Sequence, residues 1–599
     1  MHFFRISSAI VFYLLLTSVA ASGAAESNDS RPATTNAYQP SWWKEAVVYQ
    51  VYPRSFKDSN GDGIGDLKGI TSELDYIQGL GVSVIWLSPH YDSPNADNGY
   101  DIRDYRRVMT DFGTMVDFDE LLKQVKQRNM RLVLDLVVNH TSDEHQWFVE
   151  SRKSKDNPYR SYYIWRPAKN GKEPNNWTSF FSGSAWKLDP ATGEYYLHLF
   201  AEKQPDLNWD NPKVRHEVYD LMTFWLDKGV DGFRMDVIPF VSKDQTFPDL
   251  PANAQAHPEY VYAAGPHIHE YLQEMNREVL SKYDVMTVGE AFGTTLQQTP
   301  LLVDERRHEL NMIFNFDAVR INQENGVARS WTLPELKSIF TRQDAALDAH
   351  CWNTVFLSNH DNPRLVSAFG DDSAAYRVAS AKLLATMLFA LKGTPFVYQG
   401  DELGMTNYPF KSIEDFDDIE VKNAWKERVV SGKVSAADFI ANLRKTSRDN
   451  ARTPIQWDHS SNAGFTRGAK PWLAINPNYP QINAKAALAD RGSIYHYYRA
   501  MIELRSKTPA LIYGDFKDLD PANSKVFAYT RALGSDAYLI VLNFSKEEIE
   551  YAIPAGITAE GLQISNLGKT EAAATRLHLR AWEARVYKVA SSNRTAQPN

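Results

Sequence analysis

The chain has 599 residues, more than one compact core ordinarily accommodates, so we expect two or three domains. Hydrophobic residues make up 43% of the sequence and charged residues 23%, an ordinary globular composition that excludes an intrinsically disordered chain. The formal net charge of -9 argues against nucleic acid or an anionic membrane as the main partner.

The first 24 residues predict a secretory signal peptide. Arg5 supplies a short positive region, Ile10 to Leu16 is apolar, and residues 20–25 are rich in small side chains. The apolar run is too short to stay in a membrane as a spanning helix, although an uncleaved anchor is the alternative. Residues 25–40 are rich in Ser, Asn, Thr and Pro and indicate a linker. We therefore expect an exported protein, periplasmic or secreted, with no membrane contact after cleavage. Its single cysteine, Cys351, excludes an internal disulfide.

Eight short apolar segments recur along the chain, and helical patterns lie between them. Strands that are apolar throughout are buried on both faces, so eight such repeats favour an α/β fold with a closed (β/α)8 TIM barrel. The candidate strands are 47–52, 82–88, 131–139, 232–237, 285–290, 312–317, 354–359 and 394–399. The helical patterns include 118–128, 214–228, 268–282 and 373–391.

Two departures from the barrel pattern give the domain organisation. The connection after the third strand is too long for one crossover helix, and we assign residues 141–211 to an inserted subdomain. Beyond residue 511 the pattern changes to alternating strands with turn signals, which predicts a C-terminal antiparallel β-sandwich over 512–590. The catalytic barrel then comprises residues 41–140 and 212–511, and residues 591–599 form a tail.

Polar side chains stand where four of the predicted strands end. Because reactive groups of barrel enzymes lie at the C-terminal ends of the strands, we expect these side chains to share one mouth. They are His140 after the third strand, Arg234 and Asp236 on the fourth, Glu290 on the fifth, and His360 and Asp361 after the seventh.

Arg234 and Asp236 are two residues apart on one strand, so their side chains leave by the same face. We expect the arginine to keep Asp236 ionised, as a nucleophile requires, and burial to raise the pKa of Glu290 towards that of a usable acid. One attacking carboxylate and one carboxylic acid are what glycoside hydrolysis needs. For any one of these residues alone, a structural salt bridge is the alternative.

The sequence resembles the α-amylase family of glycoside hydrolases, in its oligo-1,6-glucosidase and sucrose isomerase branch, over nearly all of residues 41–590. The segment Trp42 to Phe56 resembles the first strand of that branch. Asp135-Leu-Val-Val-Asn-His140, Gly232-Phe-Arg-Met-Asp236 and Asn359-His-Asp361 are similar to conserved regions of the family, and Gln204-Pro-Asp-Leu-Asn208 is similar to a signature of the branch.

The resemblance implies a role for each matching residue. Asp236 is expected to be the nucleophile that forms a β-glucosyl-enzyme, Glu290 the acid/base, and Asp361 the third carboxylate that binds sugar hydroxyls. The residues expected to bind the substrate are Asp97, Tyr100, His140, Phe200, Arg234, His360 and Arg448. In this branch an Asp–Arg clamp, here Asp97 with Arg448, closes the back of the pocket, which implies exo-action on small oligosaccharides.

The loop after the first strand has the alternating oxygen ligands of a structural Ca²⁺ site. It lacks the distal glutamate of a full EF-hand, but related glucosidases carry a metal at this loop. A turn without metal is the alternative. The expected ligands are Asp58, Asn60, Asp62, Ile64 and Asp66.

Three activities remain in competition. Val237 follows the nucleophile, and valine there accompanies α-1,6 linkages in this branch, which favours a retaining exo-α-glucosidase acting on isomaltose-like sugars. Sucrose isomerases, or transglucosylases acting on sucrose, are the runner-up; isomerases usually carry threonine there and an Arg-x-Asp-Arg loop, where this chain reads Arg320-Ile-Asn-Gln-Glu324. A non-catalytic barrel subunit is a remote rival, because such subunits have lost the carboxylates. We expect a monomer.

Overall fold

The computed structural model describes residues 41–468, 470–568 and 575–590. The predicted signal peptide, linker and tail lie outside the described residues, so those assignments stay predictions. Among the described residues, no helix is both long and apolar enough to span a membrane.

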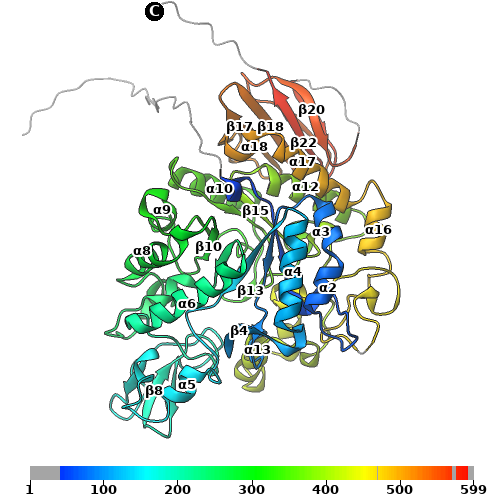
Figure 1. Ribbon diagram of the computed structural model, residues 1–599. Helices are drawn as coiled ribbons and strands as arrows, with labels where there is room; N and C mark the ends of the chain where they lie inside the picture. Colours follow the sequence, from blue (N-terminus) through cyan, green and yellow to red (C-terminus); the bar gives the residue numbers. More distant parts are fainter. Residues whose placement is uncertain (1–40, 469, 569–574, 591–599) are drawn as a thin grey trace, which may run out of the picture. The chain divides into compact units, whose positions relative to one another are not determined.

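Eight parallel strands form the barrel that the sequence predicts (Figure 1). Their order is β11-β10-β9-β5-β2-β1-β15-β14, and the two ends of this order meet where Thr354 Oγ1 of β14 donates to Ile313 O of β11 at 2.8 Å. The bounds are β1 (Val48–Val51), β2 (Val84–Leu87), β5 (Arg131–Leu136), β9 (Gly232–Met235), β10 (Met286–Glu290), β11 (Met312–Phe314), β14 (Thr354–Val355) and β15 (Thr394–Tyr398).

Several strands end earlier than the apolar pattern predicts. The third stops at Leu136, the sixth at Phe314 and the seventh already at Val355. The next residues include apolar ones, such as Val137 and Phe356, but their backbone leaves the ladder. The chain then brings the polar side chains of His140 and Asp361 to the site described below. The fourth strand stops at Met235, and Val237 has a left-handed backbone with φ 35°. That conformation is strained for a β-branched residue. It marks the turn after β9 as a candidate functional position.

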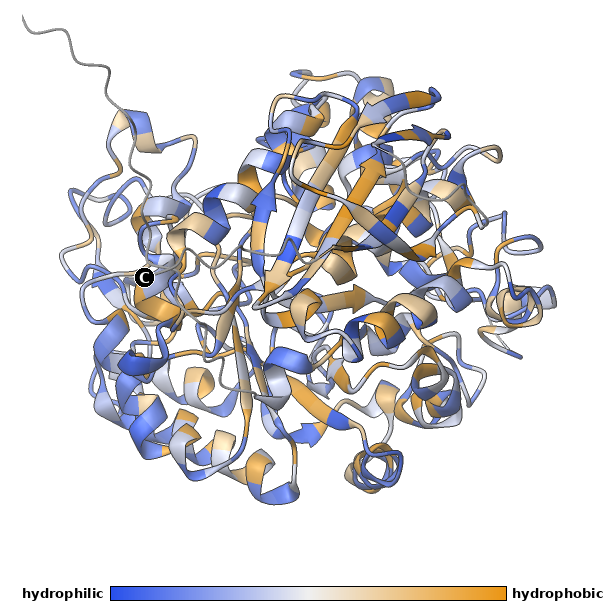
Figure 2. Cartoon of the chain, turned by 90° about the horizontal axis from the view of Figure 1, so that it is seen from above, coloured by the Kyte–Doolittle hydropathy of each residue, from blue (hydrophilic) through white to orange (hydrophobic). Residues whose placement is uncertain are grey.

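The main barrel helices begin and end at recognisable signals. Thr114 and Asp117 form a capping box at the start of α4 (Met115–Gln127). Asn211 caps α6 (Pro212–Lys228), which ends at the left-handed Gly229. The apolar faces of these helices pack on the strands, and Figure 2 shows several strands coloured as hydrophobic. Two further helices of the outer ring are α8 (Ile268–Glu278) and α12 (Arg377–Ala390).

The subdomain inserted after β5 contains a small antiparallel sheet. The strands β6 (Trp165–Pro167), β8 (Glu194–Leu197) and β7 (Trp186–Asp189) pair in that order. Trp186 and Leu197 of these strands share a buried cluster with Phe240 and Tyr262, which belong to the connection after β9. This packing fixes the insertion against the site side of the barrel.

A second insertion follows β15. It contains α13 (Ile419–Ala424), the π-helix η10 (Trp425–Val430) and α14 (Ala436–Thr446). The segment α15 (Asp449–Arg452) follows, and α17 (Ile494–Ser506) and α18 (Pro509–Tyr513) then lead out of the barrel.

Two antiparallel sheets form the C-terminal domain. A buried cluster that includes Val541, Tyr551 and Leu577 lies between them, as expected of a sandwich. The larger sheet has the order β16 (Asp515–Asp518), β17 (Val526–Leu533), β18 (Asp536–Asn543), β22 (Ala584–Val589) and β20 (Ala559–Ser565). The smaller one pairs β19 (Ile549–Ala552) with β21 (Arg576–Leu579).

Two buried arginines stabilise the region where this domain meets the barrel. Arg531 of β17 donates to Ala390 O at the end of α12 and to Ile512 O of α18. Arg505 of α17 donates to Gly393 O at 2.7 Å. Burial lowers the pKa of Arg505 to about 9 and that of Arg531 to about 10. Both guanidinium groups bind the carbonyls at helix ends, where the helix dipole favours positive charge.

Candidate active site

Arg234 of β9 is the centre of the carboxylate cluster. Its Nη1 donates to Asp135 Oδ1 at 2.7 Å and to Asp236 Oδ1 at 2.8 Å, and its Nη2 donates to Glu290 Oε2. The β9 pleat places Arg234 and Asp236 on one face, and the parallel pairing of β9 with β5 and β10 brings the other two carboxylates alongside. One guanidinium therefore serves three carboxylates.

Arg234 lowers the pKa of Asp236, as expected, but it does not act on this carboxylate alone. Burial, reinforced by the charges of Glu290 and Asp135, raises the pKa of Asp236 well above its ordinary range despite Arg234. The arginine cannot neutralise all three carboxylates, so the cluster retains a proton. A retained proton suits a site in which one carboxylate must act as an acid beside another that attacks.

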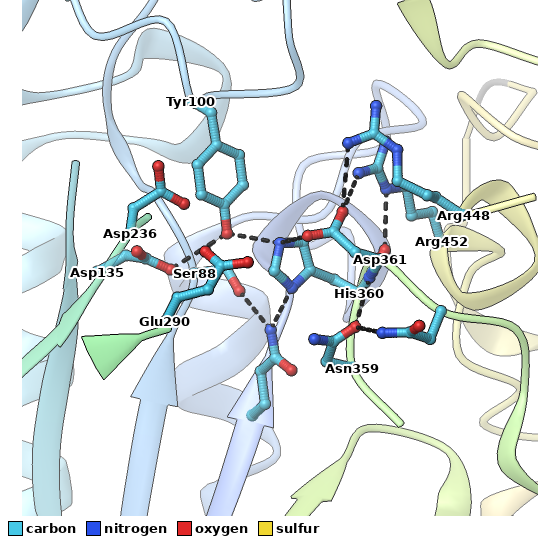
Figure 3. A network of polar contacts seen from close by, with 12 residues as sticks. Ser88, Tyr100, Asp135, Asp236, Glu290, Asn359, His360, Asp361, Arg448 and Arg452 are labelled. Carbon is cyan, nitrogen blue, oxygen red and sulfur yellow. Dashed lines mark hydrogen bonds and ion pairs between the residues drawn. The ribbon is translucent and has the colours of Figure 1, made fainter. Parts of the chain in front are cut away.

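Asp361 has the opposite electrostatic environment. Burial alone would raise its pKa, but His360, Arg448 and Arg452 outweigh burial and hold the pKa well below the usual range. Arg452 Nη2 donates to Asp361 Oδ1 at 2.7 Å, and Arg448 Nη1 lies 3.4 Å from the same oxygen (Figure 3). Both arginines come from the second insertion, which thus keeps the third carboxylate ionised.

His360 connects Asp361 to the carboxylate cluster. Its Nε2 lies 3.1 Å from Asp361 Oδ2 and 2.6 Å from the Tyr100 hydroxyl, which donates to Asp135 Oδ2 at 3.2 Å (Figure 3). The Nδ1 on the other side of the ring lies 2.8 Å from Gln50 Nε2. His360 is completely buried and lies behind the pocket wall, so it supports Asp361 and Tyr100 from behind.

Asp97 stands at the back of the pocket and is 5% exposed. Gln204 Nε2 donates to Asp97 Oδ2 at 3.0 Å, and Arg448 Nη2 lies 3.7 Å from Asp97 Oδ1. Among the described residues, Asp97 Oδ1 has no hydrogen-bond partner. Burial raises the pKa of Asp97 to about 7, while Arg448 and Arg452 lower it. Arg448 binds Asp418 more closely, through Nε and Oδ2 at 2.8 Å. The predicted clamp of Asp97 and Arg448 therefore includes Asp418 as a third residue.

His140 lies beside this clamp. Its Nε2 is 3.1 Å from Tyr100 O and 3.2 Å from Gln204 Nε2, and its ring centroid lies 5.1 Å from that of Phe200. Burial lowers the pKa of His140 to about 4, so the imidazole is neutral at pH 7.

These residues meet in one pocket of about 990 Å³. Arg234 and His360 lie behind its surface, as their near-complete burial indicates, while the other predicted site residues reach it. The predicted residues in the lining are Asp97, Tyr100, His140, Phe200, Asp236, Glu290, Asp361 and Arg448.

The sequence analysis missed several residues that hold the site together. Gln50 and Ser88 stand at the ends of the first two strands, and Gln50 Nε2 donates to Ser88 Oγ at 3.0 Å. The rule that barrel strands end in functional side chains applies to both and could have identified them. Asp135 lies inside a quoted motif, whereas nothing local in the sequence distinguishes Asp418 as a partner of Arg448.

The predicted calcium loop is ordered by its own side chains. Asp58 Oδ1 accepts from Asn60 N at 2.9 Å, Asn60 Oδ1 from Asp62 N at 2.9 Å, and Asp62 Oδ1 from Ile64 N at 2.8 Å. Asp66 caps the helix α2 (Leu67–Ser72) through Gly69 N. Within the described ranges, no three His, Cys, Asp or Glu side chains converge as a metal cluster. A cation would therefore also need the Asn60 amide and Ile64 carbonyl oxygens, donors that calcium accepts.

Comparison with known proteins identifies the family. The sequence pattern of the alpha-amylase catalytic domain matches residues 50–514, and that of the alpha-amylase SusG C-terminal domain matches residues 526–586. The chain belongs to the α-amylase family of glycoside hydrolases. Within the family it lies in the oligo-1,6-glucosidase and sucrose isomerase branch, as the sequence motifs predict.

Relatives in this branch cover nearly the whole chain. The oligo-1,6-glucosidase of Parageobacillus thermoglucosidasius is 55% identical over 92% of this chain and 99% of its own length, and that of Bacillus cereus is 51% identical over the same shares. Two crystal structures, isomaltulose synthase from Erwinia rhapontici NX5 and trehalulose synthase from Pseudomonas mesoacidophila MX-45, each have a TM-score of 0.91 and 53% identity, covering 92% of this chain and 100% of their own. The eight-stranded barrel and the C-terminal antiparallel domain are therefore those of the family.

Proposed function

We propose that the protein is a retaining, exo-acting α-glucosidase that releases glucose from short α-glucosides and prefers α-1,6 linkages. The observation that carries this proposal is the cluster of Asp236 and Glu290 around Arg234, facing Asp361 in a pocket closed at the back by Asp97 and Arg448. The similarity to oligo-1,6-glucosidases over 92% of the chain supports the same reaction class.

The reaction proceeds in two displacements. Asp236 attacks C1 of the terminal glucosyl unit while Glu290 donates its proton to the glycosidic oxygen, so that the C1–O bond breaks as a C1–carboxylate bond forms. Water then loses a proton to Glu290 and attacks C1, which releases the Asp236 carboxylate. The mechanism requires a proton on Glu290 and an ionised Asp236 at the start of the cycle. Each displacement inverts C1, so the net outcome is retention.

The back of the pocket supports exo-action. Asp97 Oδ1, buried and without a hydrogen-bond partner among the described residues, faces the same pocket as Arg448. A buried acceptor that the protein does not satisfy favours a ligand hydroxyl as its partner. The buried side chains of Gln204 and Asp418 bind this pair, so we infer that a chain end fits there and a continuing polysaccharide does not.

Sucrose isomerisation is the second candidate, because solved isomaltulose and trehalulose synthases have the same fold at 53% identity. Two sequence features favour hydrolysis. Val237 directly follows the nucleophile, and the loop beginning at Arg320 lacks the second arginine and the aspartate of the isomerase pattern.

Product analysis on isomaltose, maltose and sucrose in parallel tests the proposal. Glucose should appear fastest from isomaltose, as the α-anomer before mutarotation. Conversion of sucrose mainly to isomaltulose or trehalulose would replace the proposal with isomerisation. The non-catalytic alternative would be supported by turnover of none of the three sugars.

We further propose that the loop from Asp58 to Asp66 binds one structural Ca²⁺ ion. The residues that would hold it are Asp58, Asn60, Asp62, the Ile64 carbonyl and Asp66, all oxygen donors. The ion would neutralise the acidic loop and brace the segment after β1; it takes no part in bond breaking.

We also propose export to the periplasm or the medium and a monomeric enzyme whose partners are small sugars. The N-terminal pattern of Arg5 and the apolar run after it supports export. N-terminal sequencing of the mature protein, which should begin near residue 25, tests cleavage, and light scattering tests the monomer. An intact N-terminus would favour an uncleaved anchor.

A further inference from the structure

The pocket extends beyond the three carboxylates on the side where the leaving group departs. Its lining there includes α7 (Glu259–Tyr262) with the turn before it, Arg320, and part of α10 (Leu333–Ala346). The volume of about 990 Å³ lies at the upper end of the range for small-molecule sites, about 300–1,000 Å³. The pocket therefore has room for sugar units beyond the scissile bond.

Tyr260 projects into this outer part and is 56% exposed. The other Trp, Tyr and Phe side chains among the described residues are buried or half-buried. Scattered exposed apolar residues are ordinary on protein surfaces, but this ring lines the pocket that contains Glu290. An exposed aromatic ring inside this pocket is therefore a candidate contact for the substrate.

The backbone that carries Tyr260 is held firmly. Two positions along the same short helix, the buried Tyr262 hydroxyl accepts from Thr178 N at 2.9 Å and donates to Thr178 O at 3.1 Å. On the other side, Gly293 has φ 79°, and a Cβ there would lie 2.4 Å from Glu259 O. The helix thus packs directly against the segment that follows Glu290. Tyr260 is presented by a rigid element at a fixed place relative to the acid.

The chemistry around the ring suits a sugar. A tyrosine offers an apolar face to the C–H face of a pyranose and a hydroxyl to its polar edge. Partial burial, together with the charges of Glu259 and Asp317, raises the pKa of Tyr260, so the hydroxyl stays neutral. The charge of Arg320 lowers the pKa of Tyr260 and so partly offsets this rise. The same guanidinium lies 4.2 Å from the Phe292 ring centroid. Along the pocket lining, exposure rises from Glu290 at 8% through the half-buried Phe292 to Tyr260 at 56%, so Tyr260 lies nearer the mouth of the pocket than Phe292.

We propose that Tyr260 is the platform of a distal acceptor subsite, which binds the second glucosyl unit beyond the scissile bond of a gluco-oligosaccharide. The proposal rests on the α-glucosidase function above. Isomaltose has one unit beyond the bond and cannot reach this ring, whereas isomaltotriose can. Tyr260 would therefore set the preference for chain length and leave the chemistry of bond breaking unchanged.

The test compares isomaltose with isomaltotriose in Tyr260→Ala, Tyr260→Phe and a control, Leu301→Ala, which removes an exposed side chain outside the pocket. For Tyr260→Ala we expect kcat/KM on isomaltotriose to fall about tenfold, mainly through KM, with isomaltose within twofold. Tyr260→Phe should retain most of the trisaccharide activity, and the control should match the parent enzyme. An equal fall on both substrates, or no fall on isomaltotriose, would overturn the proposal.

Two additions separate this proposal from the proposed function. Maltose and maltotriose are assayed in parallel, so a different linkage preference changes the substrate pair and leaves the chain-length comparison intact. Binding of di- and trisaccharides is also measured by calorimetry in a Glu290→Gln background, with and without Tyr260→Ala. Loss of trisaccharide affinity alone supports the subsite even if turnover is absent, and unchanged trisaccharide affinity contradicts it.

Discussion

Gln50 Nε2 lies 2.8 Å from Nδ1 of His360. Because the same amide nitrogen also donates to Ser88 Oγ, Gln50 presents a donor to the ring, and Nδ1 must accept. Nε2, which faces Asp361 and the Tyr100 hydroxyl, then carries a ring proton. A residue at the end of the first strand thus sets the tautomer of a histidine 310 positions away.

Gln50→Leu should release this constraint. We expect kcat/KM to fall by about 10–100-fold, as for other residues that orient a site ligand from behind. In ¹⁵N-histidine NMR spectra the His360 signal, assigned with a His360→Gln variant, should change from the single Nε2–H tautomer to a mixture. Lower activity with an unchanged tautomer would show that Gln50 acts only through packing.

Replacing either reacting carboxylate should abolish turnover without unfolding the protein. Asp236→Asn removes the nucleophile and Glu290→Gln the proton donor, and each should lower kcat by at least about 10²–10⁴-fold. Asp156→Asn, an exposed aspartate away from the pocket, is the matched control. Asp236→Asn with near-normal turnover, measured after confirming that its melting temperature is retained, would disprove the mechanism.

Asp97 should make stability depend on pH. Its pKa of about 7 in the folded protein lies above the unfolded value, so the stability it contributes is complete below about pH 4 and is lost as the pH rises to about 7. Asp97→Asn does not titrate. The variant should therefore gain about 3 kcal/mol relative to the parent between pH 4 and pH 8, measured as the difference between their chemical unfolding free energies. A constant difference across this range would contradict the raised pKa.

Arg531 should be essential to the junction between barrel and C-terminal domain. Arg531→Met leaves the carbonyls of Ala390 and Ile512 without their buried donor, which should cost about 3 kcal/mol or more of unfolding free energy. Arg499→Met, on the exposed side of α17, is the control. Equal effects of the two substitutions on chemical denaturation would show that the junction does not depend on these bonds.

Removal of calcium should lower the melting temperature. The proposed ion holds the acidic loop between Asp58 and Asp66, so excess EGTA should reduce Tm by several degrees and added Ca²⁺ should restore it. Asp62→Ala, which removes an exposed ligand, should make Tm insensitive to both treatments. The same Tm with and without chelator in the parent enzyme would argue for a metal-free turn.

Sequence alone determined the eight strands and the helices between them, because burial on both faces makes each barrel strand apolar throughout. It also located Asp236, Glu290 and Asp361, since barrel chemistry is confined to strand ends and these residues stand in short motifs. The early end of the seventh strand at Val355 was not predictable, because the apolar residues after it resemble a continuing strand.

Only the tertiary structure decided how the charges of the site are distributed. The sequence pairs Arg234 with Asp236, but the parallel register of β5, β9 and β10 gives it two further carboxylates, whose charges add to burial in raising the pKa of Asp236. Gln50, Asp418 and Tyr260 likewise acquire their places through contacts between segments far apart in sequence. Short sequence motifs indicate which side chains are reactive. The pKa of a buried group, however, depends on neighbours that only the folded chain brings together.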